Sequence, residues 1–191
     1  MDFMEKSLPQ EQTCQSITKN QEAQRIAAAQ RDPQAFGELY DQYAPAICRY
    51  LLSRLGNVED AHDVTSQTFL KAVEVFPNYK HRGYFSAWLF SIARSKYVDH
   101  IRRRKHGVET IREEQVDPQP DPLNEVVATE RMAELMKCIR ILAPEEQELL
   151  RLRYVADLSF AEMAELLLKS EGAVKKSFYR LLARLQSQLE A

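Results

Sequence analysis

The sequence predicts an all-α fold of two small helical domains joined by a flexible, acidic, proline-containing linker. Apolar residues recur at spacings of three and four, the period of an amphipathic helix, and no segment alternates convincingly with the period of two that a strand shows. Residues 91–106 carry six basic residues and one acid, whereas residues 107–122 carry five acids, one arginine and three prolines. Proline and like charges disfavour packed structure. We therefore place the first domain at residues 23–106, the linker at 107–128 and the second domain at 129–191.

The composition excludes several classes of protein. The chain has 191 residues with a net charge of -2, and its polar residues 1–22 read as a disordered tail. No stretch approaches the roughly 20 apolar residues of a membrane helix, and the N-terminal residues lack the apolar segment of a signal peptide, so we expect neither membrane insertion nor secretion. Cys14, Cys48 and Cys138 lie far apart, which argues against a disulfide framework or a zinc site. A reducing, cytoplasmic setting without metal or other cofactor is expected.

Three helices are predicted in the first domain. An apolar stripe over residues 39–55 marks the first helix, and a second over residues 61–76 follows a cluster of acids that suits the positive end of a helix dipole. The third begins near Phe85, with Ser86 as its N-cap and Gly107 just beyond its end.

Four shorter helical segments are predicted after the linker. The first ends before Pro144, which together with two glutamates opens a second helix that runs to about Val155. Ser159 is expected to cap the third, with Glu162 at the capping-box position three residues on. Ser170 precedes the last helix. Two short helices joined by a tight turn, the second of them basic on its polar side, indicate a helix-turn-helix motif.

The polar side of the last helix is a candidate surface for duplex DNA. It carries Lys175, Lys176, Ser177, Tyr179, Arg180 and Arg184. A helix fits the major groove, where its early residues meet base edges and later cations meet phosphates. A solvated polar face explains such charges equally well when they are considered alone, and the helix-turn-helix pattern ahead of them favours the DNA-binding interpretation.

A loop predicted over residues 77–84 is a candidate surface for single-stranded nucleic acid. It holds Tyr79, Lys80, His81, Arg82 and Tyr84, and it is expected near the basic run Arg102–Lys105. Bases stack on aromatic rings while phosphates meet cations. The alternative is that the aromatic residues of this region pack the helical bundle.

No catalytic constellation is found in the sequence. There is no glycine-rich phosphate loop, no G-x-S-x-G and no H-E-x-x-H, and the four histidines are scattered. We expect the histidines, and the carboxylates on polar helix faces, to be solvated. The sequence therefore predicts a protein that is not an enzyme and has no catalytic or metal-binding residues.

Several segments resemble a known family, the extracytoplasmic-function (ECF) sigma factors of the bacterial sigma-70 family. The segments similar to region 2 of these proteins are 60–72, 88–94 and 99–103, and those similar to region 4 are 142–146, 152–154, 158–164 and 171–175. The resemblance covers about residues 23–106 and 129–189. It implies a two-domain, all-helical subunit that binds core RNA polymerase and directs it to promoters.

The resemblance also implies roles for individual residues. The polymerase clamp coiled coil would be bound by Asp60, Asp63, Ser66 and Gln67. The melted -10 strand would be held by Tyr79, Lys80, Arg82, Arg94, Ser95, Arg102 and Arg103. The -35 duplex would face Lys175, Lys176, Ser177, Tyr179, Arg180 and Arg184, with Arg153 on a phosphate. The implied partners are core RNA polymerase, through its clamp coiled coil and flap, promoter DNA and an anti-sigma factor.

Two rival interpretations explain part of the sequence. A free-standing helix-turn-helix regulator accounts for the second domain and leaves the first without a role. A helical adaptor accounts for the bundles but not for two basic surfaces. Co-purification with core polymerase separates the sigma-factor interpretation from both.

Overall fold

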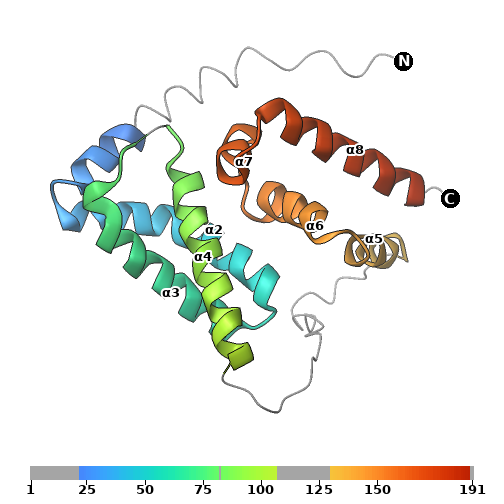
Figure 1. The fold of residues 1–191 in the computed structure, drawn as a ribbon, viewed down its shortest axis with the longest axis horizontal. Coiled ribbons are helices and arrows are strands. Elements are labelled where there is room, and N and C mark those ends of the chain that lie inside the picture. Colours follow the sequence, from blue (N-terminus) through green and yellow to red (C-terminus); the bar gives the residue numbers. More distant parts are fainter. Residues whose placement is uncertain (1–21, 82, 107–129, 190–191) are drawn as a thin grey trace.

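The computed structural model describes residues 22–81, 83–106 and 130–189, and every regular element in these ranges is helical. A helix at residues 22–29 comes first. It is followed by η1 (Pro33–Ala35), α2 (Phe36–Leu55), α3 (Val58–Val75), η2 (Phe76–Asn78), α4 (Phe85–His106), α5 (Glu130–Arg140), α6 (Pro144–Leu150), η4 (Arg151–Val155), α7 (Phe160–Leu167) and α8 (Glu171–Leu189) (Figure 1). The predicted linker and the predicted tail up to residue 21 lie outside the described residues.

Helices α2, α3 and α4 form the first domain around one apolar core. Leu39, Ile47 and Leu51 of the predicted first stripe are fully buried in α2. Helix α2 ends at Leu55 and is capped by Gly56, whose φ of 68° places it in the left-handed region that glycine adopts without steric cost. Asn57 then caps α3, because its side chain accepts a hydrogen bond from the backbone N–H of Asp60 at 2.9 Å.

The third helix begins at Phe85, as predicted, but its predicted N-cap is wrong. Helix α4 begins at Phe85, so Ser86 lies inside its first turn and is not the N-cap. Ser86 is buried, and its hydroxyl donates a hydrogen bond to Glu162 in α7. Gly107, the predicted residue beyond the helix, lies outside the described residues.

The second domain follows the predicted helix boundaries closely. Helix α6 opens at Pro144 and continues through the π-helical segment η4 to Val155, as predicted. The Ser159 and Glu162 capping box is present: the Ser159 N–H donates to Glu162 Oε2 at 2.7 Å, and the Glu162 N–H donates to Ser159 Oγ at 3.3 Å. Helix α5 ends at Arg140, earlier than predicted.

The helix-turn-helix motif consists of α7, a short turn and α8. The turn begins at Leu168, which adopts left-handed angles (φ 55°, ψ 42°) and is 91% exposed. The stripe of α8 that faces the domain core consists of Val174, Phe178, Leu181 and Leu185. Leu189, which continues the same spacing, is exposed at the end of the helix.

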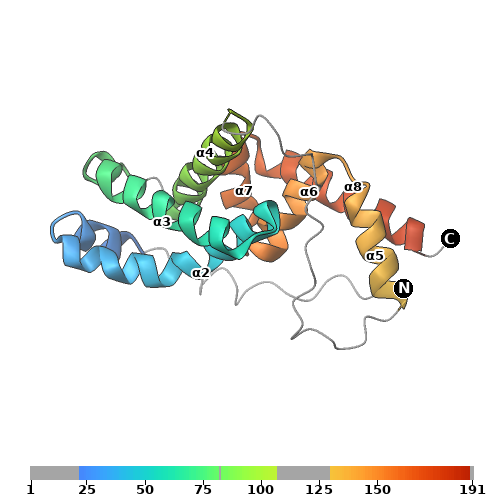
Figure 2. The ribbon, with the colours of Figure 1, turned by 90° about the horizontal axis from the view of Figure 1, so that it is seen from below.

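The two domains pack against each other. Helix α7 lies against α4 (Figures 1 and 2), and η4 lies against α2. Buried side chains from both domains belong to one apolar cluster, in which Leu152 of η4 and Met163 of α7 are fully buried. We call this packing of the two domains the closed arrangement. None of the described helices is long and apolar enough to cross a membrane.

Candidate polymerase and nucleic-acid interfaces

A polar face of α3 carries the four residues assigned to polymerase binding. Asp63 and Ser66 are exposed, and Asp60 and Gln67 are half-buried. Gln67 Nε2 donates a hydrogen bond to Asp63 Oδ2 at 2.6 Å, which joins two residues one helical turn apart. Ser66 Oγ donates to the carbonyl of His62 at 3.0 Å. Asp63 and Gln67 are therefore in direct contact, and the Ser66 hydroxyl is hydrogen-bonded to the backbone of its own helix.

The basic end of α4 contacts this same face. Arg104 Nη1 lies 2.9 Å from Asp60 Oδ2, and Arg103 Nη2 donates to Gln67 Oε1 at 2.9 Å. His100 Nε2 lies 3.5 Å from Asp60 Oδ1. The His100 side chain is only 12% exposed, so the expectation of a solvated histidine is wrong here. Arg103, assigned to DNA, and Gln67, assigned to polymerase, are thus direct neighbours.

The aromatic residues of the loop pack together beside the start of α4. The ring centroid of Tyr79 lies 4.4 Å from that of Trp88, 5.5 Å from that of Phe85 and 6.1 Å from that of Phe76. The Tyr79 carbonyl accepts a hydrogen bond from Gln30 Nε2 at 2.7 Å. Tyr79 is therefore a half-buried member of the bundle, in line with the packing alternative. Lys80 in the same loop is exposed, and Arg82 lies outside the described residues.

The remaining residues assigned to the -10 strand lie along α4. Ser95 and Arg102 are exposed. The Arg94 side chain is 38% exposed, and its Nε lies 3.5 Å from Glu148 Oε1 in the second domain. In the closed arrangement Arg94 is therefore engaged by the other domain.

A buried carboxylate, Glu148 of α6, forms the polar centre of the domain contact. Tyr50 Oη donates to Glu148 Oε1 at 2.7 Å, and Arg54 Nη1 lies 3.2 and 3.1 Å from its two oxygens. Glu148 is 6% exposed and Tyr50 is fully buried. The meeting of Tyr50, Arg54 and Glu148 could not be predicted from the sequence, because the contacts join residues 94 and 98 positions apart and leave no local pattern.

Burial and charge explain the titration of the groups around Glu148. Burial, reinforced by the negative charge of Glu148, raises the pKa of Tyr50. Burial alone lowers the pKa of Arg54, but Tyr50 and Glu148 outweigh it and the pKa of Arg54 is raised. Burial and the positive charge of Arg54 lower the pKa of Arg151 in η4. Two arginines, Arg54 and Arg94, form ion pairs with this one carboxylate.

The polar side of α8 faces solvent. Lys175, Lys176 and Arg180 are exposed, Tyr179 is 55% exposed and Ser177 is half-buried. Lys175 Nζ pairs with Glu171 Oε1 at 2.7 Å on the same helix. These residues share one accessible surface, as the sequence predicted for the last helix.

Two arginines assigned to the -35 duplex are held by groups of their own domain. Arg153 Nη1 donates to the carbonyl of Leu158 at 2.9 Å, and its guanidinium lies 5.3 Å from the ring centroid of Phe160. Arg184 Nη2 lies 2.5 Å from Glu146 Oε2. The hydrogen bond from Arg184 lowers the pKa of Glu146.

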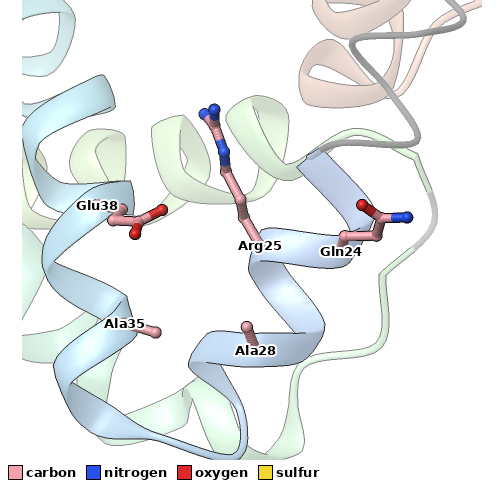
Figure 3. A pocket seen from close by; sticks show the side chains of 5 residues that line it. All are labelled: Gln24, Arg25, Ala28, Ala35 and Glu38. Carbon is pink, nitrogen blue, oxygen red and sulfur yellow. The ribbon is translucent and has the colours of Figure 1, made fainter.

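Two shallow hollows lie beside the first-domain helices. A pocket of about 430 Å³ separates the 22–29 helix from the start of α2, and Figure 3 shows the side chains that line it: Gln24, Arg25, Ala28, Ala35 and Glu38. A groove of about 330 Å³ between α2 and α3 is lined by Tyr40, Asp41, Ala44, Pro45, Cys48, His62, Thr65 and Ser66. Among the described residues, no group of three or more His, Cys, Asp or Glu side chains could hold a metal ion.

Comparison with known proteins identifies both domains. Residues 39–107 match the Sigma-70 region 2 family, and residues 132–185 match the family described as Sigma-70, region 4. The ECF RNA polymerase sigma factor SigD of Mycobacterium tuberculosis is 33% identical over 171 residues, which cover 84% of this chain and 79% of SigD. The ECF RNA polymerase sigma factor BldN of Streptomyces coelicolor is 36% identical over 166 residues, which cover 85% of this chain and 62% of BldN.

Solved structures share the fold. CnrH, in complex with the cytosolic domain of CnrY, is 22% identical, with a TM-score of 0.57 over 87% of this chain and 95% of CnrH. The sigma factor RpoE of Bartonella quintana, in complex with the anti-sigma factor NepR, is 20% identical, with a TM-score of 0.56 over 82% of this chain and 97% of RpoE. With regions 2 and 4 in this order and ECF relatives that align along most of its length, the chain belongs to the ECF RNA polymerase sigma factors of the sigma-70 family.

Proposed function

We propose that this protein binds core RNA polymerase in the cytoplasm and directs it to promoters, and that it acts by binding rather than by catalysis. The observation that carries the proposal is the presence of both matched regions in the order region 2, region 4. The domain boundaries that go with it are 23–106 for region 2 and 129–191 for region 4.

The polymerase clamp coiled coil is proposed to lie on α3, along the face of Asp60, Asp63, Ser66 and Gln67. Two features support this choice. Asp63 and Ser66 are exposed, and Ser66 also lines the groove between α2 and α3. A helical partner along α3 would therefore meet acidic and polar groups and a hollow for one of its own side chains. The polymerase flap is proposed to contact region 4.

The melted -10 strand is proposed to run along α4 and the Tyr79 loop. Support comes from the exposed Lys80, Ser95 and Arg102, which offer a path of polar and positive groups for a phosphate backbone. The neighbouring ring of Tyr79 is half-buried and presents part of an aromatic surface for stacking.

The -35 duplex is proposed to receive α8 in its major groove. Support comes from the exposure of Lys175, Lys176, Tyr179 and Arg180 on the second helix of the helix-turn-helix motif. The early cations would reach base edges and the later ones phosphates. Arg153 and Arg184 are proposed to act at the rim of this surface, because each is already held by its own domain.

An anti-sigma factor is proposed as a further partner. RpoE of Bartonella quintana shares this fold and was solved in complex with an anti-sigma factor. A partner of that kind would compete with polymerase for the exposed face of α3.

Co-elution with purified core polymerase tests the polymerase step. The full-length protein should elute with core polymerase in size-exclusion chromatography, and Asp63→Lys should elute mainly alone. Glu59→Lys is a matched control, because Glu59 is an exposed acid in the first turn of the same helix. Wild-type protein that does not bind core polymerase would reject the proposal in favour of a free-standing regulator.

A further inference from the structure

One anionic side chain of region 4 is enclosed by hydrogen-bond donors of region 2. Glu148 accepts hydrogen bonds from Tyr50 Oη at 2.7 Å and from Arg54 Nη1 at 3.1 and 3.2 Å. Arg94 Nε lies 3.5 Å from the same carboxylate. We call Tyr50, Arg54 and Arg94 the anion site. Its three members come from α2 and α4, and the anion in it comes from α6.

Contacts within region 2 hold two members of the anion site in position without Glu148. The guanidinium of Arg54 lies 4.2 Å from the ring centroid of Tyr97, and Arg54 Nη1 donates to Tyr50 Oη at 2.8 Å. The Tyr50 ring packs edge-on against Phe90 with centroids 5.3 Å apart. A departure of Glu148 would therefore leave a preformed site with two positive charges and one hydroxyl donor.

Such a site has the chemistry of a phosphate receptor. Arginine binds carboxylate and phosphate oxygens with the same charge-assisted, planar geometry. A tyrosine hydroxyl commonly donates to phosphate oxygens in protein–DNA contacts. One member, Arg94, lies on the helix proposed to hold the -10 strand.

We propose that the anion site binds a backbone phosphate of promoter DNA, and that Glu148 takes the place of this phosphate in the closed arrangement. This inference rests on the proposed function, and it adds Tyr50 and Arg54 to the DNA-binding residues. Closure and DNA binding then exclude each other, because one site cannot hold two anions.

The competition is strong because Glu148 is tethered. An intramolecular ligand acts at a high effective concentration, so it outcompetes a free strand of similar intrinsic affinity. The apparent affinity for DNA falls by the fraction of molecules in which the site is open. A polymerase that holds regions 2 and 4 apart would free the site without any change inside region 2.

A second polar contact supports the closed arrangement away from the anion site. Ser86 Oγ in α4 donates a hydrogen bond to Glu162 Oε1 in α7. Ser86→Ala removes this bond and leaves Tyr50, Arg54, Arg94 and Glu148 intact. The variant therefore shifts closure without touching the proposed phosphate contacts.

The test measures binding of the free full-length protein to a fluorescent single-stranded DNA oligonucleotide of mixed sequence, over a range of salt concentrations. Glu148→Gln keeps the size of the side chain and removes its charge. It should raise the affinity on the order of tenfold, within the usual range of coupling between two sites. Small-angle X-ray scattering should show a larger radius of gyration. Ser86→Ala should shift both quantities in the same direction. Glu145→Gln, an exposed acid on the same helix, is the matched control and should change neither.

The phosphate contact itself is tested in the open background. Adding Arg54→Ala to Glu148→Gln should cancel the gain in affinity and reduce the slope of log affinity against log salt by about 0.7, the value for one phosphate on a single strand. Arg49→Ala, an exposed cation on the same helix, is the control for a general loss of charge. Circular dichroism checks that each variant is folded. If Glu148→Gln does not fold, the comparison of Ser86→Ala with the Ser86→Ala, Arg54→Ala double variant tests the same phosphate contact.

Two results would overturn the inference. One is an open Glu148→Gln or Ser86→Ala protein whose affinity for the oligonucleotide equals that of the wild type. The other is an unchanged salt slope when Arg54 is removed in the open background. Neither measurement requires polymerase. A wild-type protein that fails to bind core polymerase would therefore reject the proposed function, and the outcome of the DNA-binding test would still stand.

Discussion

Arg103 on α4 donates a hydrogen bond of 2.9 Å to the side-chain oxygen of Gln67 on α3. The contact joins a residue assigned to promoter DNA with a residue assigned to polymerase. Arg104, the next residue of α4, lies 2.9 Å from Asp60, which is also assigned to polymerase, so the basic end of α4 and the α3 face share one polar network. A partner that engages the α3 face therefore competes for the groups that orient the basic end of α4.

Releasing this network should strengthen DNA binding by region 2. We expect Gln67→Ala, which removes the acceptor of Arg103, to raise the affinity of the free protein for single-stranded DNA. Exposed ion pairs and hydrogen bonds contribute little to stability, about 0–1 kcal/mol, so the fold should persist. Fluorescence anisotropy measures the affinity, and Glu74→Ala, an exposed acid near the other end of α3, is the control. A lower affinity in Gln67→Ala would mean that Gln67 positions Arg103 for DNA.

The ring of Tyr79 should matter for the fold as well as for promoter opening. Tyr79→Ala removes contacts with Trp88 and Phe85 and should lower the stability of region 2. It should also cost about 1–3 kcal/mol for each lost base stack. Tyr79→Phe keeps the ring and should open promoters normally in permanganate footprinting. A stable, folded Tyr79→Ala protein with a normal transcription bubble would assign this residue to neither role.

A glycine at residue 168 should stabilise the helix-turn-helix motif. Leu168 adopts left-handed angles, which cost a side-chain-bearing residue about 1–2 kcal/mol, and glycine adopts them freely at an entropic cost of about 0.5–1 kcal/mol. Because the side chain is 91% exposed, its removal loses little burial. Leu168→Gly should therefore slow hydrogen exchange of the α7 and α8 amides.

Leu168→Ala is the matched control for this turn. Alanine removes the same leucine atoms but keeps the Cβ that is unfavourable in the left-handed region, so exchange should remain near the wild-type rate. Faster exchange in Leu168→Gly than in Leu168→Ala would contradict the argument.

The Glu146 and Arg184 pair should make a small, pH-dependent contribution to stability. The pKa of Glu146 is lowered from its usual 4.5 in the folded protein, chiefly by the hydrogen bond from Arg184. The folded state thus favours the ionised carboxylate. Its contribution is present above the unfolded pKa and is lost as the pH falls through the folded pKa.

Arg184→Gln should raise the pKa of Glu146 toward its usual value. Carbon-detected NMR titration of the Glu146 carboxyl group measures it directly. The stability difference between wild type and variant should vanish in acid, where both carboxyls are protonated. Lys176→Gln, an exposed cation on the same helix, should leave the titration unchanged, and an equal shift in both variants would remove the specific role of Arg184.

The sequence predicted the helices well, because their signals are local. The apolar spacing of residues 39–55 anticipated α2, and Pro144 and the Ser159–Glu162 capping box anticipated the starts of α6 and α7. Each signal depends on neighbours within one or two helical turns. The exposure of the polar side chains of α8 was predicted from the same helical spacing, because they lie opposite its apolar stripe.

What the sequence could not predict involves contacts between distant residues. In the sequence, Ser86 stands where an N-cap is expected and is a residue type that caps helices. In the structure its hydroxyl donates a hydrogen bond to Glu162, 76 residues away. Glu148 belongs to a helix rich in acids and was expected to be solvated, yet it is 6% exposed and is bonded by Tyr50 and Arg54 of α2. Arg94 and Arg153 carry the expected charge, but only the structure identifies the groups that hold them.

Transcription in vitro tests the central claim most directly. Purified core RNA polymerase should be incubated with the full-length protein and a library of promoter fragments, and run-off transcripts should be sequenced. We predict transcripts that start at a defined subset of fragments, that require this protein, and that decline strongly with Asp63→Lys but not with Glu59→Lys. Transcripts that are absent, or identical with and without the protein, would contradict its assignment as a promoter-directing subunit.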